Sequence, residues 1–144
     1  MATVLMIEDN PNDFKMADSI LSGSFEFTHA ATLQDALGMM QAIIPDVILL
    51  DLNLPDSKGM STLEALVKQF PDVPIVVWSG AGEASEAMRL GADEFILKNG
   101  NIETVRAALI SAIARHPFKS VKQDIASLQK LIKTDRETDG KEPQ

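Results

Sequence analysis

Five side chains that could take part in acid, nucleophilic or ion-pair chemistry each follow a short apolar run of the sequence. They are Glu8, Asp9, Asp51, Ser79 and Lys98. If the fold brings them together, the three carboxylates would repel one another unless a cation lay among them. Oxygen ligands without histidine or cysteine favour a hard ion, Mg²⁺ or Mn²⁺. A carboxylate beside such an ion can attack a phosphoryl group to form an aspartyl phosphate, whose oxygens a hydroxyl and an amine would stabilise.

Asp51 is the centre of this hypothesis. It follows four apolar residues, 47–50, which indicate a strand buried on both faces, and it leads into a loop that contains Pro55 and Gly59. In open α/β sheets, ligands bind outside the carboxyl ends of the strands, which is where Asp51 would lie. This segment alone is equally consistent with an aspartate that caps a helix or a turn, so the hypothesis depends on the other strand ends.

Alternating strand and helix patterns predict a fold that brings these strand ends together. Apolar segments predict five strands, at residues 3–7, 25–31, 47–51, 73–78 and 93–97. Helical spacing and terminal signals predict helices at residues 11–21, 32–44, 57–70, 83–90 and 102–115. This alternation predicts a doubly wound α/β domain, with a parallel sheet covered by helices on both faces. The carboxyl ends of parallel strands share one edge, so the five side chains would meet there.

Composition narrows the class of protein. The chain has 144 residues, 45% hydrophobic and 24% charged, which predicts a single soluble globular domain without a membrane span. Its start lacks a basic segment and meets acids within nine residues, which argues against a signal peptide, and zero cysteines exclude disulfides and thiolate chemistry. We therefore expect a cytoplasmic protein. A net charge of −8 opposes the nucleic-acid backbone, so we expect no direct nucleic-acid binding.

The motifs around the five side chains resemble those of the receiver domain of two-component response regulators, over about residues 3–115. The acid pair lies in Ile-Glu-Asp-Asn-Pro, and Asp51 lies in Leu-Leu-Asp-Leu-Asn-Leu-Pro. Ser79 lies in Trp-Ser-Gly, and Lys98 ends Gly-Ala-Asp-Glu-Phe-Ile-Leu-Lys. The resemblance implies a flavodoxin-like sheet with the strand order 2-1-3-4-5. It also implies that the protein is a switch that modifies itself, not an enzyme.

The resemblance assigns roles to the site residues. Asp51 would accept a phosphoryl group from a histidine kinase or phosphotransfer protein, and Ser79 and Lys98 would contact that group. Mg²⁺ would be bound directly by Asp9 and Asp51, through water by Glu8, and by the backbone carbonyl of Asn53. The modified surface would then bind a downstream protein target.

Three features depart from the family pattern or concern its switch. Phe95, three residues before the lysine, falls at the switch aromatic, whose rotamer would follow the hydroxyl of Ser79. A phenylalanine on a strand is, however, more often simply part of the core. Asn99 replaces the usual proline after Lys98, and a cis bond without proline costs roughly 3 kcal/mol, so we expect a trans bond. The segment 79–91 is short, which predicts a short fourth helix.

The C-terminal part is less typical of the family. Residues 1–117 would form the receiver domain and residues 118–134 a helical extension, whose apolar stripe consists of Val121, Ile125, Leu128 and Ile132. This helix would contribute to a homodimer or to output, so deleting residues 118–144 should change oligomeric state or partner binding. The polar tail 135–144 is predicted to be disordered, and the chain is interpreted as a stand-alone receiver.

Two alternative functions remain open at this point. The first is a receiver-like module that binds partners without phosphorylation, which the short fourth helix and Asn99 would allow. The second is a hydrolase with an aspartate nucleophile, of the haloacid dehalogenase-like type, which Asp51-Leu52-Asn53 superficially resembles. Those enzymes carry a second acid two residues after the nucleophile, and here that position is Asn53, so we rank this alternative last.

Overall fold

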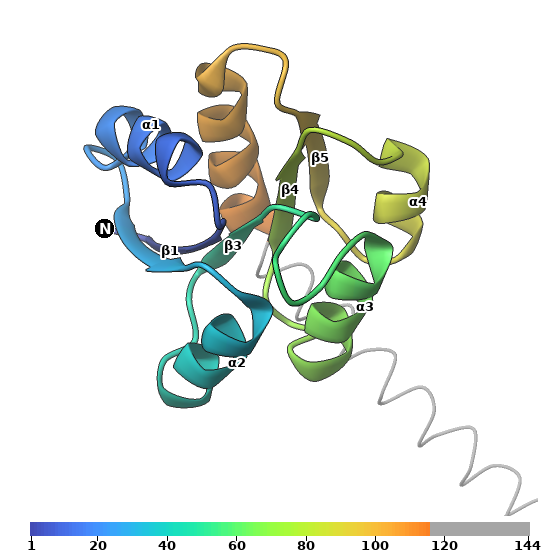
Figure 1. The fold of residues 1–144 in the computed structure, drawn as a ribbon. Coiled ribbons are helices and arrows are strands. Elements are labelled where there is room, and N and C mark those ends of the chain that lie inside the picture. Colours follow the sequence, from blue (N-terminus) through green and yellow to red (C-terminus); the bar gives the residue numbers. More distant parts are fainter. Residues whose placement is uncertain (116–144) are drawn as a thin grey trace, which may run out of the picture.

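The computed structural model describes residues 1–115, which form a parallel five-stranded sheet covered by helices on both faces (Figure 1). The strand order is β2-β1-β3-β4-β5, and every neighbouring pair is parallel. The strands are β1 Thr3–Ile7, β2 Glu26–Ala30, β3 Val47–Leu50, β4 Ile75–Ser79 and β5 Glu94–Leu97. The predicted fold class and strand order are confirmed, with strand ends shifted by one or two residues.

The helices divide between the two faces of the sheet. They are α1 Pro11–Leu21, α2 Leu33–Ala42, α3 Met60–Gln69, α4 Ala84–Arg89 and the helical residues 102–115. One core lies between the sheet and α2, α3 and α4, and the other lies between the sheet and α1 with the helical residues 102–115. Successive strand residues serve opposite cores: Leu50 packs in the first and Leu49 in the second. The central strands β1, β3 and β4 are therefore almost wholly apolar, whereas the edge strand β2 carries the exposed polar residues Glu26, Thr28 and His29.

The start of α3 differs from the prediction. The apolar spacing predicted a helix from residue 57, but α3 begins at Met60. Residues 57–59 close a compact loop instead: the backbone N–H of Gly59 donates to the carbonyl of Leu52 over 2.7 Å, and Asn53 and Lys58 form an antiparallel bridge. Gly59 has φ +73°, a left-handed conformation that stops a helix from extending backwards. The loop is set by these tertiary contacts, which helical periodicity does not report.

The shortness of the fourth helix is confirmed, since α4 has six residues. It is followed by Gly91, which has φ +113° and packs directly against Val67 of α3. Among residues 1–115 no peptide bond is cis, so the bond between Lys98 and Asn99 is trans as expected. The predicted extension 118–134 and tail 135–144 lie outside the described residues. Within the described part of the chain, no helix is long and apolar enough to cross a membrane.

Candidate functional site

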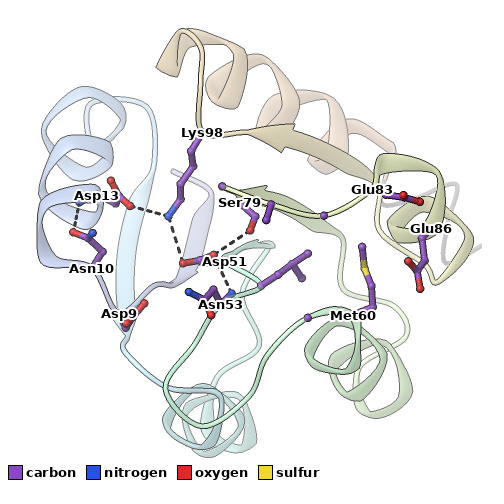
Figure 2. Close-up of a pocket in the computed structure, with 15 residues that line it drawn as sticks. Asp9, Asn10, Asp13, Asp51, Asn53, Met60, Ser79, Glu83, Glu86 and Lys98 are labelled. Atoms are coloured by element: carbon purple, nitrogen blue, oxygen red, sulfur yellow. Dashed lines mark hydrogen bonds and ion pairs between the residues drawn. The ribbon is translucent and has the colours of Figure 1, made fainter.

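The five side chains that the sequence singled out meet at the carboxyl edge of the sheet. Figure 2 shows four of them, Asp9, Asp51, Ser79 and Lys98, around one pocket. Glu8 and Asp9 follow β1, Asp51 follows β3, Ser79 ends β4 and Lys98 follows β5. The two central strands β1 and β3 are hydrogen-bonded neighbours, and β4 and β5 continue the sheet on the same side. Parallel pairing therefore places all five at one end of the domain, as the alternation of strands and helices predicted.

Asp51 lies at the base of a pocket and is 7% exposed. Its Oδ1 accepts hydrogen bonds from the Ser79 hydroxyl over 3.3 Å and from the backbone N–H of Asn53 over 3.1 Å. Its Oδ2 lies 3.4 Å from the Lys98 ammonium. The pocket opens between the loop after β3 and the small residues Gly80, Ala81 and Gly82 after β4. An anion can therefore approach the carboxylate without displacing a large side chain.

The carboxylates of Glu8, Asp9 and Asp51 form a tight cluster. One oxygen from each lies within 4.8 Å of the others. Glu8 is 1% exposed. Burial, and after it the neighbouring Asp51, raises the pKa of Glu8 to about 7. Lys98 and the backbone N–H of Asn10 lower this pKa but do not outweigh the rise. The cluster thus carries negative charge that the protein compensates only in part. An all-oxygen donor set at this spacing fits a hard divalent cation, Mg²⁺ or Mn²⁺.

Lys98 is the cation that the protein supplies to this site. Its ammonium lies 2.5 Å from Glu8 Oε1, 2.8 Å from Asp13 Oδ2 and 3.4 Å from Asp51 Oδ2. It also lies 5.0 Å from the ring centroid of Trp78, within range of a cation–π interaction. Burial would lower the pKa of Lys98, but the hydrogen bonds to Asp13 and Glu8 outweigh this effect and raise the pKa above its usual value. Lys98 therefore remains charged.

Asp13 is a site residue that the sequence did not indicate. The pattern placed it only in the first turn of α1, whereas the structure turns its carboxylate into the pocket toward Lys98 (Figure 2). The sequence around Asp13 carries no signal for this role, because an acidic residue in the first turn of a helix is common for stabilising the helix alone. Its partner, however, is 85 residues away in the sequence.

The loop after β3 carries Asn53 and is attached to α2. The Asp56 carboxylate accepts hydrogen bonds from the backbone N–H groups of Leu33 and Gln34, each over 2.9 Å, in the first turn of α2. The N–H groups of Gln34 and Leu33 lower the pKa of Asp56 below its usual range. Asn53 itself lies beside Asp51, with its side-chain oxygen accepting from the Lys58 ammonium over 3.0 Å. The loop is thus held before Asn53 by the hydrogen bond to Asp51 and after it by the contacts of Asp56 and Lys58.

Phe95 lies on β5 at the border of the pocket. Its ring is half-buried and packs against the core formed with α2, α3 and α4. A Cβ built on Gly82, which has φ +118°, would lie 3.3 Å from this ring and 3.3 Å from Leu52. The ring therefore lies under the loop that follows Ser79. Its role as a switch remains a prediction.

The sequence model of the response regulator receiver domain matches residues 4–110. Among curated proteins, the luminescence regulatory protein LuxO of Vibrio campbellii is 36% identical over 114 residues, covering 76% of this chain and 25% of LuxO. The KDP operon transcriptional regulatory protein KdpE of Escherichia coli is 34% identical over 120 residues, covering 81% of this chain and 53% of KdpE. The chain thus spans a quarter to about half of the length of these relatives.

Solved structures share the fold. A CheY-like response regulator receiver domain protein from Methanospirillum hungatei superposes with a TM-score of 0.74 at 21% identity, covering 83% of this chain and 98% of the other. NtrX from Brucella abortus gives a TM-score of 0.72 at 27% identity, covering 88% of this chain and 29% of NtrX. The arrangement of strands and helices is therefore shared with both of these structures.

Proposed function

Because the chain belongs to the response regulator receiver domain family, we propose that it is a signalling switch in which Asp51 accepts a phosphoryl group. Receiver domains act with histidine kinases and downstream effectors, and a histidine kinase or phosphotransfer protein is the donor proposed here. The observation that supports this most is the position of Asp51, at the base of an open pocket with Ser79, Lys98 and two further carboxylates around it.

The transfer forms one bond and breaks one. A carboxylate oxygen of Asp51 attacks the phosphorus atom, and the bond from phosphorus to the imidazole nitrogen of the donor breaks, leaving the electron pair on that nitrogen. The attack creates negative charge at the phosphoryl oxygens, which Lys98 can neutralise because it stays protonated at 3.4 Å from the attacking carboxylate. The Ser79 hydroxyl, now 3.3 Å from Asp51, can donate to a phosphoryl oxygen instead.

The acid cluster is suited to hold the cation that this chemistry needs. We propose that Asp9 and Asp51 bind Mg²⁺ or Mn²⁺ directly, that Glu8 does so through water, and that the backbone carbonyl of Asn53 is a further ligand. When bound, the ion supplies positive charge to the phosphoryl oxygens. Asp56, by attaching the loop to α2, keeps the Asn53 backbone in place beside Asp51.

We further propose that phosphorylation changes the surface that binds a downstream protein. Movement of the Ser79 hydroxyl toward a phosphoryl group would free space beside the loop 80–82. The half-buried ring of Phe95, which already lies under this loop, would then turn further inward and change the surface around α4 and β5. Met88 and Leu97 on those elements are exposed apolar side chains, 45% and 41% exposed, that a downstream protein target could cover. We also propose that the protein forms a homodimer through residues 118–134 and lies in the cytoplasm. We expect no direct contact with nucleic acid.

Intact-mass analysis tests this function. The chain is incubated with acetyl phosphate and Mg²⁺, with parallel samples in EDTA and with the variant Asp51→Asn. We expect a gain of one phosphoryl group that depends on Mg²⁺ and is absent in the variant. Absence of any gain, also with a histidine kinase as donor, would contradict the switch.

The six-residue α4 favours a second candidate, a module that binds partners without phosphorylation. In that case Mg²⁺ would still change the fluorescence of Trp78 while no phosphoryl group is gained. Release of many phosphates per chain would instead indicate the hydrolase that the sequence left as the last alternative.

A further inference from the structure

Lys98 and three residues around its ammonium, Glu8, Asn10 and Asp13, form a closed ring of hydrogen bonds. The backbone N–H of Asn10 donates to Glu8 Oε2 over 3.1 Å, and the backbone N–H of Asp13 donates to Asn10 Oδ1 over 3.2 Å. Lys98 closes the ring by donating to Asp13 Oδ2 and to Glu8 Oε1. Glu8 is buried, and Lys98 contacts both Glu8 and Asp13, so the ring fixes the position of the ammonium.

Asp13 holds its place in this ring through the start of α1. Asn10 is the N-cap of the helix, and its side-chain oxygen accepts from the N–H groups of Asn12 and Asp13. Pro11, with its fixed φ, suits the first helical position and leaves no N–H unpaired. The carboxylate of Asp13 therefore projects from a rigid helix start, and Figure 2 shows it opposite the ammonium of Lys98.

Of the three carboxylates that the Lys98 ammonium contacts, Asp51 makes the weakest contact. A lysine ammonium has three N–H donors. Two of them serve Glu8 and Asp13, at 2.5 and 2.8 Å, and the third reaches Asp51 only at 3.4 Å. Short contacts between charged groups are the strong ones. The side chain of Lys98 is 16% exposed, so solvent cannot replace these partners freely.

We propose that Asp13 is a positioning residue that holds Lys98 against Glu8 and away from Asp51, and thereby limits the rate at which Asp51 accepts a phosphoryl group. The inference rests on the proposed function. During transfer, the oxygen–phosphorus bond forms at Asp51 and the bond to the leaving group breaks, and Lys98 must turn toward the phosphoryl oxygens as they gain charge. The contact with Asp13 opposes this movement. Removing it lets Lys98 reach the reacting group.

A matched control separates this effect from the loss of one negative charge. Glu86 on α4 lines the same pocket and, like Asp13, is half-buried. Within residues 1–115 the ion pairs of Lys98 go to Glu8, Asp13 and Asp51, and Glu86 is not among them. Glu86→Gln therefore removes the same charge from the pocket without releasing Lys98.

The test measures the rate of phosphorylation of the full chain by acetyl phosphate at saturating Mg²⁺, by intact mass, for wild type, Asp13→Asn, Asp13→Ala and Glu86→Gln. We expect Asp13→Asn to raise the rate by about fivefold, which corresponds to about 1 kcal/mol. Asp13→Ala, which also removes the hydrogen-bond acceptor, should raise the rate further. Glu86→Gln should change the rate by less than about twofold, because Glu86 makes no ion pair with Lys98 among residues 1–115. Circular dichroism establishes that each variant is folded.

A second readout is independent of phosphorylation. Trp78 is the single tryptophan, and its ring lies 5.0 Å from the Lys98 ammonium, so its emission reports where that ammonium lies. Asp13→Asn should change the emission without donor or Mg²⁺, and Glu86→Gln should not. Unchanged emission in Asp13→Asn, or a phosphorylation rate equal to or below that of wild type, would overturn the inference, as would equal effects of the two variants. A wild-type chain that gains no phosphoryl group would contradict the proposed function, and the emission would still decide whether Asp13 holds Lys98.

Discussion

The buried carboxyl of Glu8 should make the stability of the cation-free protein depend on pH. Its pKa is raised from 4.5 to about 7 in the folded state, so the folded protein holds a proton that the unfolded chain has released. A raised pKa contributes stability that is present below pH 4.5 and is lost as the pH rises through about 7. The interval from 4.5 to about 7, at about 1.4 kcal/mol per pH unit, corresponds to about 3 kcal/mol. Glu8→Gln stays neutral and should not lose this stability.

The assay is urea unfolding in EDTA at pH 5, 6, 7 and 8, followed by the fluorescence of Trp78. We expect the free energy of unfolding of wild type to fall by about 2 to 3 kcal/mol relative to Glu8→Gln between pH 5 and pH 8. Glu64→Gln, an exposed glutamate of α3, is the control and should follow wild type. Added Mg²⁺ should reduce the difference, because a nearby cation favours the ionised carboxyl. A difference between wild type and Glu8→Gln that is the same at every pH would refute the reasoning.

Two further predictions concern the elements that position the site. Gly91→Ala should lower the free energy of unfolding by roughly 1–3 kcal/mol, because the residue has φ +113° and a new Cβ would lie 3.0 Å from Val67. The control Gly38→Ala, in open space on α2, should instead stabilise the protein slightly. Similar urea midpoints for the two variants would contradict this prediction. At neutral pH, wild type should have a higher free energy of unfolding than Asp56→Asn, because backbone N–H groups stabilise the ionised carboxyl and lower the pKa of Asp56. This difference should shrink as the pH falls below about 3.9. A difference that does not change with pH would argue against the contact with α2.

The strand ends were predictable because the sheet is parallel and buried on both faces. A run of apolar residues followed by a polar one, as at residues 47–51, marks both the strand and its carboxyl end, and parallel pairing then brings the ends together. The strand order itself came from family resemblance. The short α4 was also predictable, because the segment from Ser79 to Gly91 is shorter than in the family that the sequence resembles.

What the sequence did not predict depends on contacts between distant residues. The helix at 57–70 was expected three residues too early, since Gly59 and the pairing of Asn53 with Lys58 set the start of α3. Asp13 was interpreted only as part of a helix start, because its contact with Lys98 exists only when β1 and β5 lie in one sheet. Such contacts leave no periodic trace in the sequence.

The central claim is that Asp51 is the phosphoacceptor, and chemical trapping tests it most directly. The protein is treated with acetyl phosphate and Mg²⁺ and then reduced with borohydride, which converts an aspartyl phosphate to homoserine, and the modified peptide is sequenced by mass spectrometry. This account predicts homoserine at position 51 and at no other aspartate of residues 1–115. Homoserine at Asp9 or Asp13, or a phosphoryl group on Ser79, would contradict it.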